Sequence, residues 1–556
     1  GGRPASRTPS PAELRAAADR MTSPDGLTAK QTTVTSPELV MAWAQAHQQG
    51  ARADRIREIA ERFTRLCGIE QVVAADGPGR PARYSTRELV EHERRALAIV
   101  ARGHNTGSPT APPPAVEGLS AEQRRMVEHV LASRDRVVCV VGLAGAGKTT
   151  AASAIHAAYR AEGTPILGAA PSGIAAQQLE DATAIPTTTL HRLTAEASRA
   201  GLPVGCVVLV DEAGMADTRT LAPLLDHVER ARGKLILVGD PRQLPAVGAG
   251  GLYAALVDRH GAITLTENRR QHSAPERHAL DRLRRGHGRD YLAHAERERR
   301  LITEPTATAT RARLLSDWWT HARDNLDGTL IIAHRRRDVR QLNTLARGIL
   351  DSHGRLGNER LTAAGIELAV GDRVICCANH DEHGVRNGTR ATVTSLDPAA
   401  RSLTLATDRG TTVTLTAAYL DAGHLDHGYA ITGHAAQGVT IDAALVLADG
   451  DHRRLQEWGY VALSRARLET RLYLTETALE PADARFGQDG GADPRSSLAA
   501  ALERSAREQL ATQQTPLTGP ARRTSAAVDP VPAPDRLARQ QEVARRLLDE
   551  SFAPSL

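Results

Sequence analysis

The stretch Gly142-Leu143-Ala144-Gly145-Ala146-Gly147-Lys148-Thr149 decides the fold of this 556-residue chain. Its spacing, G-x-x-x-x-G-K-[ST], is that of a phosphate-binding loop. The apolar, β-branched run at 137–141 predicts a buried parallel strand before the loop, and residues 150–155 predict the start of a helix after it. Backbone N–H groups and the helix N-terminus would then hold a phosphate anion together.

Lysine is rare in this chain, which makes Lys148 informative. Only three of the 70 basic residues are lysines, and the others are arginines. A site between the β- and γ-phosphates of a nucleotide needs a compact ammonium, and a planar guanidinium does not fit there. The lysine therefore indicates nucleotide binding.

The composition narrows the class of protein further. The net charge of +5 is a mild basic excess that is compatible with nucleic acid, and 3% aromatic residues argue against a surface built mainly on base stacking. The five cysteines form no CxxC pair, which indicates a reducing cytoplasm. No apolar run reaches membrane-spanning length, so no membrane insertion is expected. The chain begins Gly1-Gly2 without methionine, and we expect it to be a piece of a longer protein.

The pattern of strands and helices predicts an α/β fold with two parallel sheets. Apolar strands alternate with helical segments from about 119 to 474. Within this region, residues 369–415 carry short strands parted by turns, which predicts a small inserted β-barrel. The predicted boundaries are a helical N-terminal accessory region at 1–106, a proline-rich linker at 107–118, an ATP-binding domain at 119–268, a second domain at 269–480, and a tail at 481–556. The tail has a disorder-prone composition, with two predicted helical stretches near 498–511 and 536–548.

Two more apolar strands end in polar residues that suit phosphate chemistry. The strand at 207–210 is followed by Asp211 and Glu212. In a phosphate-loop protein the first carboxylate would hold Mg²⁺ together with the Thr149 hydroxyl, and the second would activate the attacking water. The strand at 235–239 leads into a loop with Gln243, whose amide can reach a γ-phosphate.

Two arginines lie inside recognisable sequence motifs. Arg270 follows the first predicted sheet, and Arg465 lies near the end of the second. Phosphoryl transfer builds up charge on equatorial oxygens, and an arginine brought from a second domain stabilises that charge. Most arginines of such an arginine-rich chain are solvated, so only the motif context marks these two.

Taken together, the motifs resemble those of a known family. They occur in the order Gln123, the phosphate loop, 170–173, 189–193, 211–215, 239–245, 268–271, 429–438 and 460–465. This series is similar to that of a superfamily 1 helicase of the RecD-like branch. More narrowly, it resembles the helicase portion of conjugative relaxases of the TraA/TrwC (MobF) type, and residues 84–88 and 93–95 resemble the segment before the helicase in those relaxases.

The resemblance implies a role for each matching residue. Gln123 would read adenine, and Arg270, Gln243 and Arg465 would surround the γ-phosphate. The nucleotide and its Mg²⁺ would be bound by Gly142, Gly145, Gly147, Lys148, Thr149, Thr150 and Asp211, with Glu212 activating water. The path of a single DNA strand would be lined by Pro171, Ser172, Thr189, His191, Thr432, His434 and Gln437.

The resemblance also implies an architecture and a set of partners. Two RecA-like domains would hold ATP between them and DNA across their top, and an SH3-like barrel would close over the strand. The expected partners are single-stranded or tailed duplex DNA and other conjugative transfer proteins of a bacterial cytoplasm, with movement from 5′ to 3′. Nicking activity is not expected, because a His-hydrophobic-His cluster and an N-terminal nucleophilic tyrosine are missing from the sequence.

Departures from the family pattern leave other functions open. Ala435 stands where relatives often carry Lys or Arg, and the short span between His191 and Val207 leaves little room for a strand-separating hairpin, so translocation is better supported than unwinding. The alternatives are a RecD-like repair or recombination helicase and a non-unwinding DNA-binding module of a transfer complex.

Overall fold

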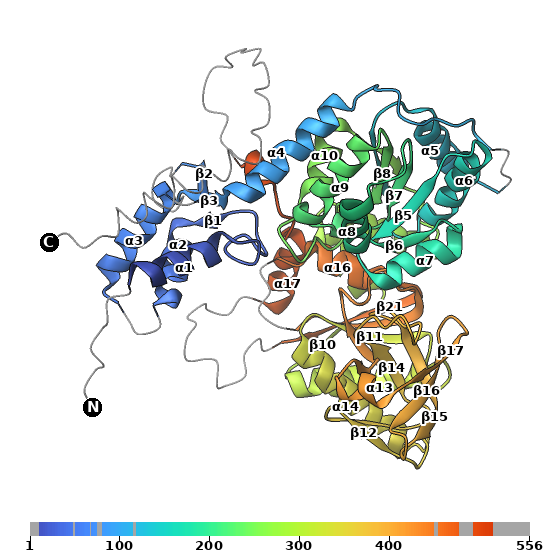
Figure 1. Cartoon of the computed structure of the whole chain (residues 1–556). Coiled ribbons are helices and arrows are strands. Elements are labelled where there is room, and N and C mark those ends of the chain that lie inside the picture. The colour runs from blue at the N-terminus through green and yellow to red at the C-terminus, as the bar shows by residue number, and fades with distance from the viewer. Residues whose placement is uncertain are drawn as a thin grey trace.

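The computed structural model describes residues 10–47, 51–66, 68–74, 81–114, 118–449, 454–476 and 493–514. Figure 1 shows an N-terminal unit in blue, reached along the helix α4 (Arg87–Arg102), and two larger units, one above the other. The upper unit contains the phosphate loop, and the lower unit contains the residues from α11 (Ala274–Arg284) to β21 (Ala466–Thr475). None of the helices in the described ranges is long and apolar enough to cross a bilayer.

The upper unit is built on a six-stranded, fully parallel sheet. In spatial order the strands are β6 (Thr187–Thr189), β5 (Ile166–Ala170), β7 (Val207–Val210), β8 (Lys234–Gly239), β4 (Val137–Gly142) and β9 (Ile263–Leu265). Its helices are α5 (Ala121–Ala132), α6 (Lys148–Ala161), α7 (Gly173–Thr183), α8 (Leu190–Ala200), α9 (Thr218–Arg230) and α10 (Leu252–His260).

Helices cover both faces of this sheet. Because successive strand residues point to opposite faces, each strand contributes side chains to two apolar cores. Val208 and Val210 pack in one apolar core with α4, α8, α9 and α10, whereas Val207 and Leu209 pack in another with α5, α6 and α7. The parallel, helix-covered sheet predicted from the sequence is confirmed.

The lower unit repeats this plan with five parallel strands. Their spatial order is β10 (Leu301–Glu304), β21 (Ala466–Thr475), β20 (Ile441–Leu447), β11 (Thr329–Ala333) and β19 (Ala430–Thr432). Its helices are α11 (Ala274–Arg284), α12 (Gly288–Arg297), α13 (Ala307–Ala322), α14 (Arg336–Ser352) and α16 (Gln456–Leu463). Leu330 and Ile332 face α11, α12 and α16, and Ile331 and Ala333 face α13 and α14.

An antiparallel subdomain interrupts the lower unit between α14 and β19. A hairpin of β12 (Leu361–Ala363) and β13 (Ile366–Leu368) precedes a sheet with the order β17 (Thr412–Leu415), β16 (Ser402–Thr407), β15 (Arg390–Asp397), β14 (Arg373–Cys376) and β18 (Leu425–His427). The short helix α15 (Ala417–Asp421) joins β17 to β18. The subdomain has an apolar core of its own, and β18 lies beyond residue 415, where the predicted insertion ends.

The N-terminal unit contains strands as well as the predicted helices. The helices α1 (Pro11–Thr22), α2 (Ser36–Ala46) and α3 (Ala53–Leu66) accompany an antiparallel sheet with the order β1 (Val34–Thr35), β3 (Arg83–Thr86) and β2 (Ile69–Val73). A purely helical N-terminal region is therefore an incomplete description. These strands are too short to produce a clear alternating pattern, and only their pairing at long range defines them.

Residues 493–514 run from the lower unit to the N-terminal unit, and we call them the strap. The strap begins with α17 (Pro494–Glu503), whose Leu498 and Leu502 join the apolar core of the lower unit. It ends with the single turn η2 (Ala511–Gln513), which packs on α4. The helical stretch predicted near 536–548 lies outside the described residues.

Candidate functional site

The phosphate loop connects β4 to α6 as the sequence predicts. Gly145 and Gly147 have φ angles of 77° and 75°, a left-handed conformation that glycine adopts without strain. Lys148 Nζ donates a hydrogen bond to Gly142 O at 3.1 Å, so the ammonium folds back over the loop. A Cβ on Gly142 would lie 2.4 Å from the Lys148 side chain, so only glycine leaves room for it.

The start of α6 and the residue Gln123 border the same loop. Thr149 is half-buried and Thr150 is exposed in the first turn of α6. Gln123 is 2% exposed; its Nε2 donates to Gly147 O at 3.2 Å and its Oε1 accepts from Ser120 N at 2.9 Å. In this conformation protein groups occupy both amide atoms of Gln123, and its role toward adenine stays a prediction.

The two carboxylates meet the loop from the end of β7. Asp211 Oδ1 accepts a hydrogen bond from Glu212 N at 2.9 Å. Burial, followed by the nearby Glu212 carboxylate, raises the pKa of Asp211 to about 6, while the charge of Lys148 acts in the opposite direction. Glu212 has a φ of 50°, a rare conformation for a non-glycine residue that marks functional sites.

Gln243 lies in the loop after β8, and the structure adds an ion pair beside it. Gln243 is 4% exposed, and its backbone N donates to Asp240 O at 3.0 Å. Arg284, on α11 of the lower unit, donates through two nitrogens to the Asp240 carboxylate at 2.8 and 3.1 Å. Sequence reasoning missed Arg284, because nothing in its local pattern distinguishes it from the many surface arginines.

The two predicted arginines are brought together at the phosphate loop. Arg269 N donates to Gly145 O at 3.0 Å, and a Cβ on Gly145 would lie 2.6 Å from Arg270 Cβ. Arg270 Nη1 donates in turn to Ser464 O at 3.0 Å, directly beside Arg465. Residues from the end of the upper unit thus connect the loop to the arginine motif of the lower unit.

Arg465 is a buried guanidinium that bonds only to uncharged groups. It is 1% exposed; its Nε donates to Val461 O at 2.7 Å and its Nη2 to Ser464 Oγ at 2.8 Å. Burial, followed by the charge of Arg270, lowers the pKa of Arg465 to about 9, and burial also lowers the pKa of Arg270. Within the described ranges no carboxylate forms an ion pair with either arginine. Both guanidinium groups therefore lack a directly bound anion, although the charge of Glu212 acts on each of them.

The upper and lower units are in direct contact at this site. Ala144 N, in the phosphate loop, donates to Tyr460 Oη of α16 at 3.4 Å, and Ala144 and Leu244 pack in the apolar core of the lower unit. A ligand held by the loop would therefore be touched from both units. Only its place in the arginine motif distinguishes Tyr460 in the sequence.

Four of the residues predicted to line a DNA strand lie on the upper unit. Pro171 and Ser172 are half-buried in the turn after β5, where Ser172 Oγ caps α7 by accepting from Ala175 N at 3.2 Å. Thr189 caps α8 in the same way, accepting from Arg192 N at 3.3 Å. His191 is exposed, with its Nε2 3.3 Å from Thr220 Oγ1.

The other three lie at the end of β19 and in the turns that follow it, on the lower unit. Thr432 is half-buried and its Oγ1 accepts from Ala435 N at 3.3 Å, while His434 is exposed. Partial desolvation by the surrounding protein, followed by the charge of Arg336, lowers the pKa of His434. Gln437 Nε2 donates to Glu212 Oε2 at 3.2 Å, which links the proposed strand path to the carboxylate beside the phosphate loop.

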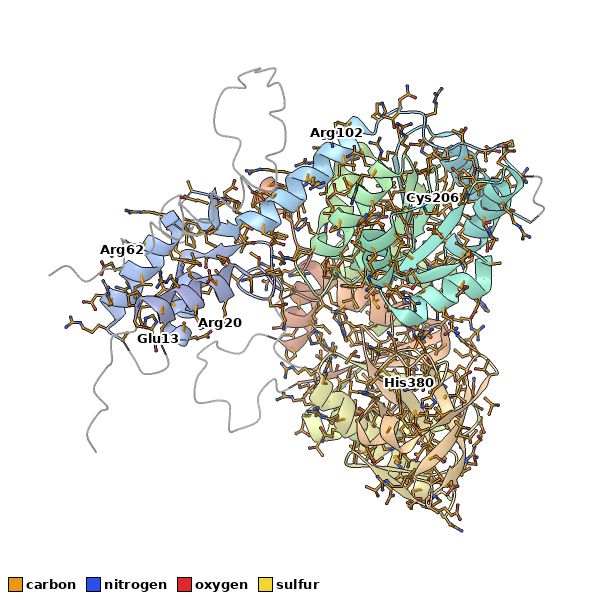
Figure 2. All side chains as sticks on the ribbon, in the orientation of Figure 1. Glu13, Arg20, Arg62, Arg102, Cys206 and His380 are labelled. Carbon is orange, nitrogen blue, oxygen red and sulfur yellow. The ribbon has the colours of Figure 1, made fainter. Side chains whose placement is uncertain are left out.

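The antiparallel subdomain reaches over the turn at Pro171 and Ser172. A Cβ on Gly173 would lie 2.8 Å from Asn379 Oδ1, and a Cβ on Gly388 would lie 3.2 Å from Ile174 Cγ2. Figure 2 labels His380, which follows Asn379 in the loop 379–388, on the lower unit. The inserted subdomain and the predicted DNA-lining turn are therefore neighbours.

Comparisons with known proteins agree with this geometry. Residues 118–306 match a family described as "AAA domain". The conjugal transfer protein TraA of Rhizobium radiobacter is 36% identical over 420 residues, 73% of this chain and 37% of that protein. The ATP-dependent RecD2 DNA helicase of Deinococcus radiodurans is 30% identical over 210 residues, 36% of this chain and 29% of that protein.

A solved structure of Bacteroides Pif1 bound to ssDNA is 19% identical, with a TM-score of 0.43, and the match covers 65% of this chain and 93% of that one. The chain spans little more than a third of the length of TraA. Through its ordered motifs, its AAA domain and its TraA and RecD2 relatives, the chain is related to the RecD-like branch of the superfamily 1 helicases and to the TraA conjugal transfer proteins.

Proposed function

We propose that this chain is an ATP-driven motor that moves along single-stranded DNA and separates duplex strands during conjugative transfer. Arg270 and Arg465 carry the proposal: a half-buried and a fully buried guanidinium group meet beside the phosphate loop, and no carboxylate forms an ion pair with either among the described residues. Buried charge is costly unless it is paired, so the site calls for an anionic ligand. A triphosphate on the loop supplies that anion.

The donor set of the site also fits Mg²⁺. The Asp211 carboxylate and the Thr149 hydroxyl are hard oxygen ligands, and they border the loop that would hold the phosphates. When bound, the metal would neutralise charge between the β- and γ-phosphates. Burial raises the pKa of Asp211, and a bound cation would stabilise the ionised form of that carboxylate.

The protein groups divide the work of phosphoryl transfer between the two units. Lys148 holds the phosphates, and Glu212 orients and deprotonates the attacking water. Arg465, and with it Arg270, stabilises the charge that develops on the equatorial oxygens. Gln243, in the loop after β8, contacts the γ-phosphate and loses that contact when the γ-phosphate leaves. Because Arg465 belongs to the lower unit, loss of the γ-phosphate removes a contact between the units.

The link between hydrolysis and DNA runs through Gln437. Its side chain contacts Glu212, and its turn also carries Thr432 and His434. A change at the γ-phosphate that moves the units apart would shift this turn relative to Pro171, Ser172, Thr189 and His191. Two states that grip the strand at different positions give directional movement. Contacts to phosphate and sugar make the grip independent of sequence and sensitive to salt.

The family relationship supports the biological role and the polarity that we propose. TraA matches 73% of the chain, against 36% for RecD2, which favours conjugative transfer over repair. We propose 5′-to-3′ movement, as in the RecD-like branch, in the bacterial cytoplasm and beside other transfer proteins. The antiparallel subdomain, which we propose to be SH3-like, would close over the strand at Gly173.

An ATPase assay tests the motor. We expect single-stranded DNA to stimulate Mg²⁺-dependent ATP hydrolysis by the wild type, and Lys148→Ala to abolish it, because the loop loses the ammonium that holds the phosphates. Lys30→Ala, at an exposed lysine of the N-terminal unit, is the matched control and keeps the wild-type rate. Equal rates for wild type and Lys148→Ala would instead favour a DNA-binding module without a motor.

A strand-displacement assay tests polarity and unwinding. With ATP and Mg²⁺ we expect displacement from duplexes with a 5′ tail and none from duplexes with a 3′ tail. Activity restricted to the 3′-tailed substrate contradicts the proposed direction. ATP-driven removal of a bound streptavidin block, without displacement from either duplex, limits the function to translocation.

A further inference from the structure

The helix that leads into the arginine motif is held by the strap. Glu457, near the start of α16, is 1% exposed. Its Oε2 accepts a hydrogen bond from Ala506 N at 2.8 Å, and its Oε1 accepts one from Ser505 Oγ. No cation pairs with Glu457 within the described ranges. A buried carboxylate is expensive unless donors satisfy it, so these two bonds fix strap and helix together.

Packing and backbone contacts make the same joint stiff. Leu455 N donates to Ala501 O at 2.8 Å, immediately before α16. A Cβ on Gly459 would lie 2.3 Å from Leu502 Cδ2, so α17 packs directly against α16. All eight residues of α16 are buried. The helix therefore moves as one body with the strap at one end and Arg465 just beyond the other.

The far part of the strap is anchored on the upper and N-terminal units. Leu510 is fully buried in the core between α4, α9 and α10. Glu93 of α4, also fully buried, accepts hydrogen bonds from Ala511 N and Thr512 N, both at 2.9 Å. Glu508 Oε2 accepts from Thr32 N at 3.1 Å and from Thr32 Oγ1 at 3.0 Å.

We propose that the strap couples the phosphate site to the N-terminal unit, and that Glu457 is the positioning residue through which it does so. The inference rests on the proposed ATPase function. A ligand that moves Arg465 moves α16, and Glu457 transmits that movement to Ser505 and Ala506. The anchors at Leu510 and Glu93 prevent the strap from absorbing the movement locally. Coupling of this kind is reciprocal, so whatever binds the N-terminal unit changes the ATPase.

Hydrogen–deuterium exchange on the whole chain, with and without Mg²⁺ and ADP–aluminium fluoride, tests the coupling. In the wild type we expect the analogue to change exchange at the phosphate loop, at 504–514 and at 28–35. In Glu457→Gln we expect the loop to respond as before, and the responses at 504–514 and 28–35 to disappear. We also expect kcat to fall about fivefold, with the KM for ATP within about twofold, because Arg465 acts on the transition state.

Three further variants separate coupling from general damage. Glu503 lies on the same strap, but its carboxylate contacts Arg289, at 3.4 Å from the backbone N and 3.7 Å from Nε, and not Glu457. Glu503→Gln therefore keeps the wild-type rate and response. Ser505→Ala removes one hydroxyl and gives a smaller change in the direction of Glu457→Gln, even if Glu457→Gln folds poorly. Glu508→Gln breaks the far contact, and it loses the response at 28–35 while kcat stays near the wild-type value.

The outcomes distinguish this inference from the proposed function. A wild type without ATP hydrolysis and without a response at the phosphate loop overturns both. A wild type that hydrolyses ATP, together with a Glu457→Gln or Ser505→Ala variant that retains the full response at 28–35 and the wild-type kcat, overturns the coupling alone. A Glu503→Gln variant that behaves like Glu457→Gln also overturns it, because the strap would then be responding to any loss of charge.

Discussion

At the scale of single residues, the nucleotide site contains charged groups that gain an oppositely charged partner only when a ligand binds. Arg465 bonds to a backbone carbonyl and a hydroxyl, both uncharged, in a position that is 1% exposed. Its planar group reaches both partners at once, which a lysine ammonium on a single stem cannot reproduce. The arginine is therefore chemically specific at this position.

Arg465→Lys should lower kcat by about 10³-fold, because arginines in this role contribute that much to transition-state stabilisation. Steady-state ATPase kinetics measure the change, and the KM for ATP should move much less. Arg467→Lys is the matched control, since Arg467 is exposed and pairs with Asp442 outside the site. Equal losses in the two variants would show that Arg465 has no special place in the reaction.

A second buried cation, Lys234, has a structural role. Its Nζ donates to Pro109 O, Val130 O and Ser133 O at 2.6 to 2.9 Å and lies 3.1 Å from Tyr159 Oη. This contact holds part of the predicted proline-rich linker against the upper unit. The local sequence cannot reveal it, because the acceptors come from distant segments.

Lys234→Met should destabilise the upper unit by about 3 kcal/mol, because several buried oxygens lose a charged donor. Thermal unfolding followed by fluorescence measures the effect. Lys30→Met, at an exposed lysine, should leave the melting temperature unchanged. Wild-type stability in Lys234→Met would mean that water replaces the ammonium without cost.

At the scale of elements, α4 joins the N-terminal unit to the upper unit through one cluster of polar contacts. Arg219 of α9 donates to both oxygens of Glu88 at 2.9 to 3.2 Å and also to Thr28 O at 2.8 Å. Burial alone would raise the pKa of Glu88, but hydrogen bonds from His92 and Arg219 outweigh it and lower the pKa to about 2. The folded structure therefore stabilises the ionised form of the Glu88 carboxylate.

A group with a lowered pKa stabilises the fold above its ordinary pKa and loses that effect as the pH falls toward the folded value. The stability difference between wild type and Glu88→Gln should therefore be constant above about pH 4.5 and shrink steadily toward pH 2. Denaturant unfolding at several pH values measures it. Glu91→Gln, at an exposed neighbour on α4, should show no such trend. A difference independent of pH would exclude the Glu88–Arg219 pair as its origin.

The elements themselves show how far sequence reasoning reaches. The strand, loop and helix around Lys148 are contiguous, so their spacing alone predicts them correctly. The strands β1, β2 and β3 escaped prediction because they are short and pair at long range. The course of the strap beyond α17 escaped for the same reason: Ala511 bonds to Glu93, 418 positions earlier in the chain.

At the scale of the whole molecule, the antiparallel subdomain rests on the upper unit through weak contacts. Arg409 and Asp181 lie 2.8 Å apart, but their side chains are 24% and 57% exposed, and Arg192 and Asp381 are 3.9 Å apart. Exposed ion pairs contribute about 1 kcal/mol or less and are screened by salt. The subdomain is therefore held less firmly than the apolar cores of either unit.

Raising the salt to about 1 M should increase hydrogen exchange in the loop 379–388 while β14 and β15 stay protected. The reason is that salt screens the ion pairs that hold the subdomain on the upper unit, but does not weaken the apolar core of the subdomain. Asp181→Arg should give the same pattern at low salt, and the charge swap of Asp181→Arg with Arg409→Asp should restore protection. Protection that is indifferent to salt and to Asp181→Arg would mean that packing of Gly173 against Asn379 holds the subdomain by itself.

The pair of guanidinium groups beside the phosphate loop has a practical consequence. Because no carboxylate forms an ion pair with either group within the described ranges, an oxyanion from the buffer can act as a surrogate ligand. Sulfate or pyrophosphate in the storage medium would then raise the heat tolerance of the protein, and chloride would not. A simple buffer screen would thus report the chemical class of the ligand before any turnover is recorded.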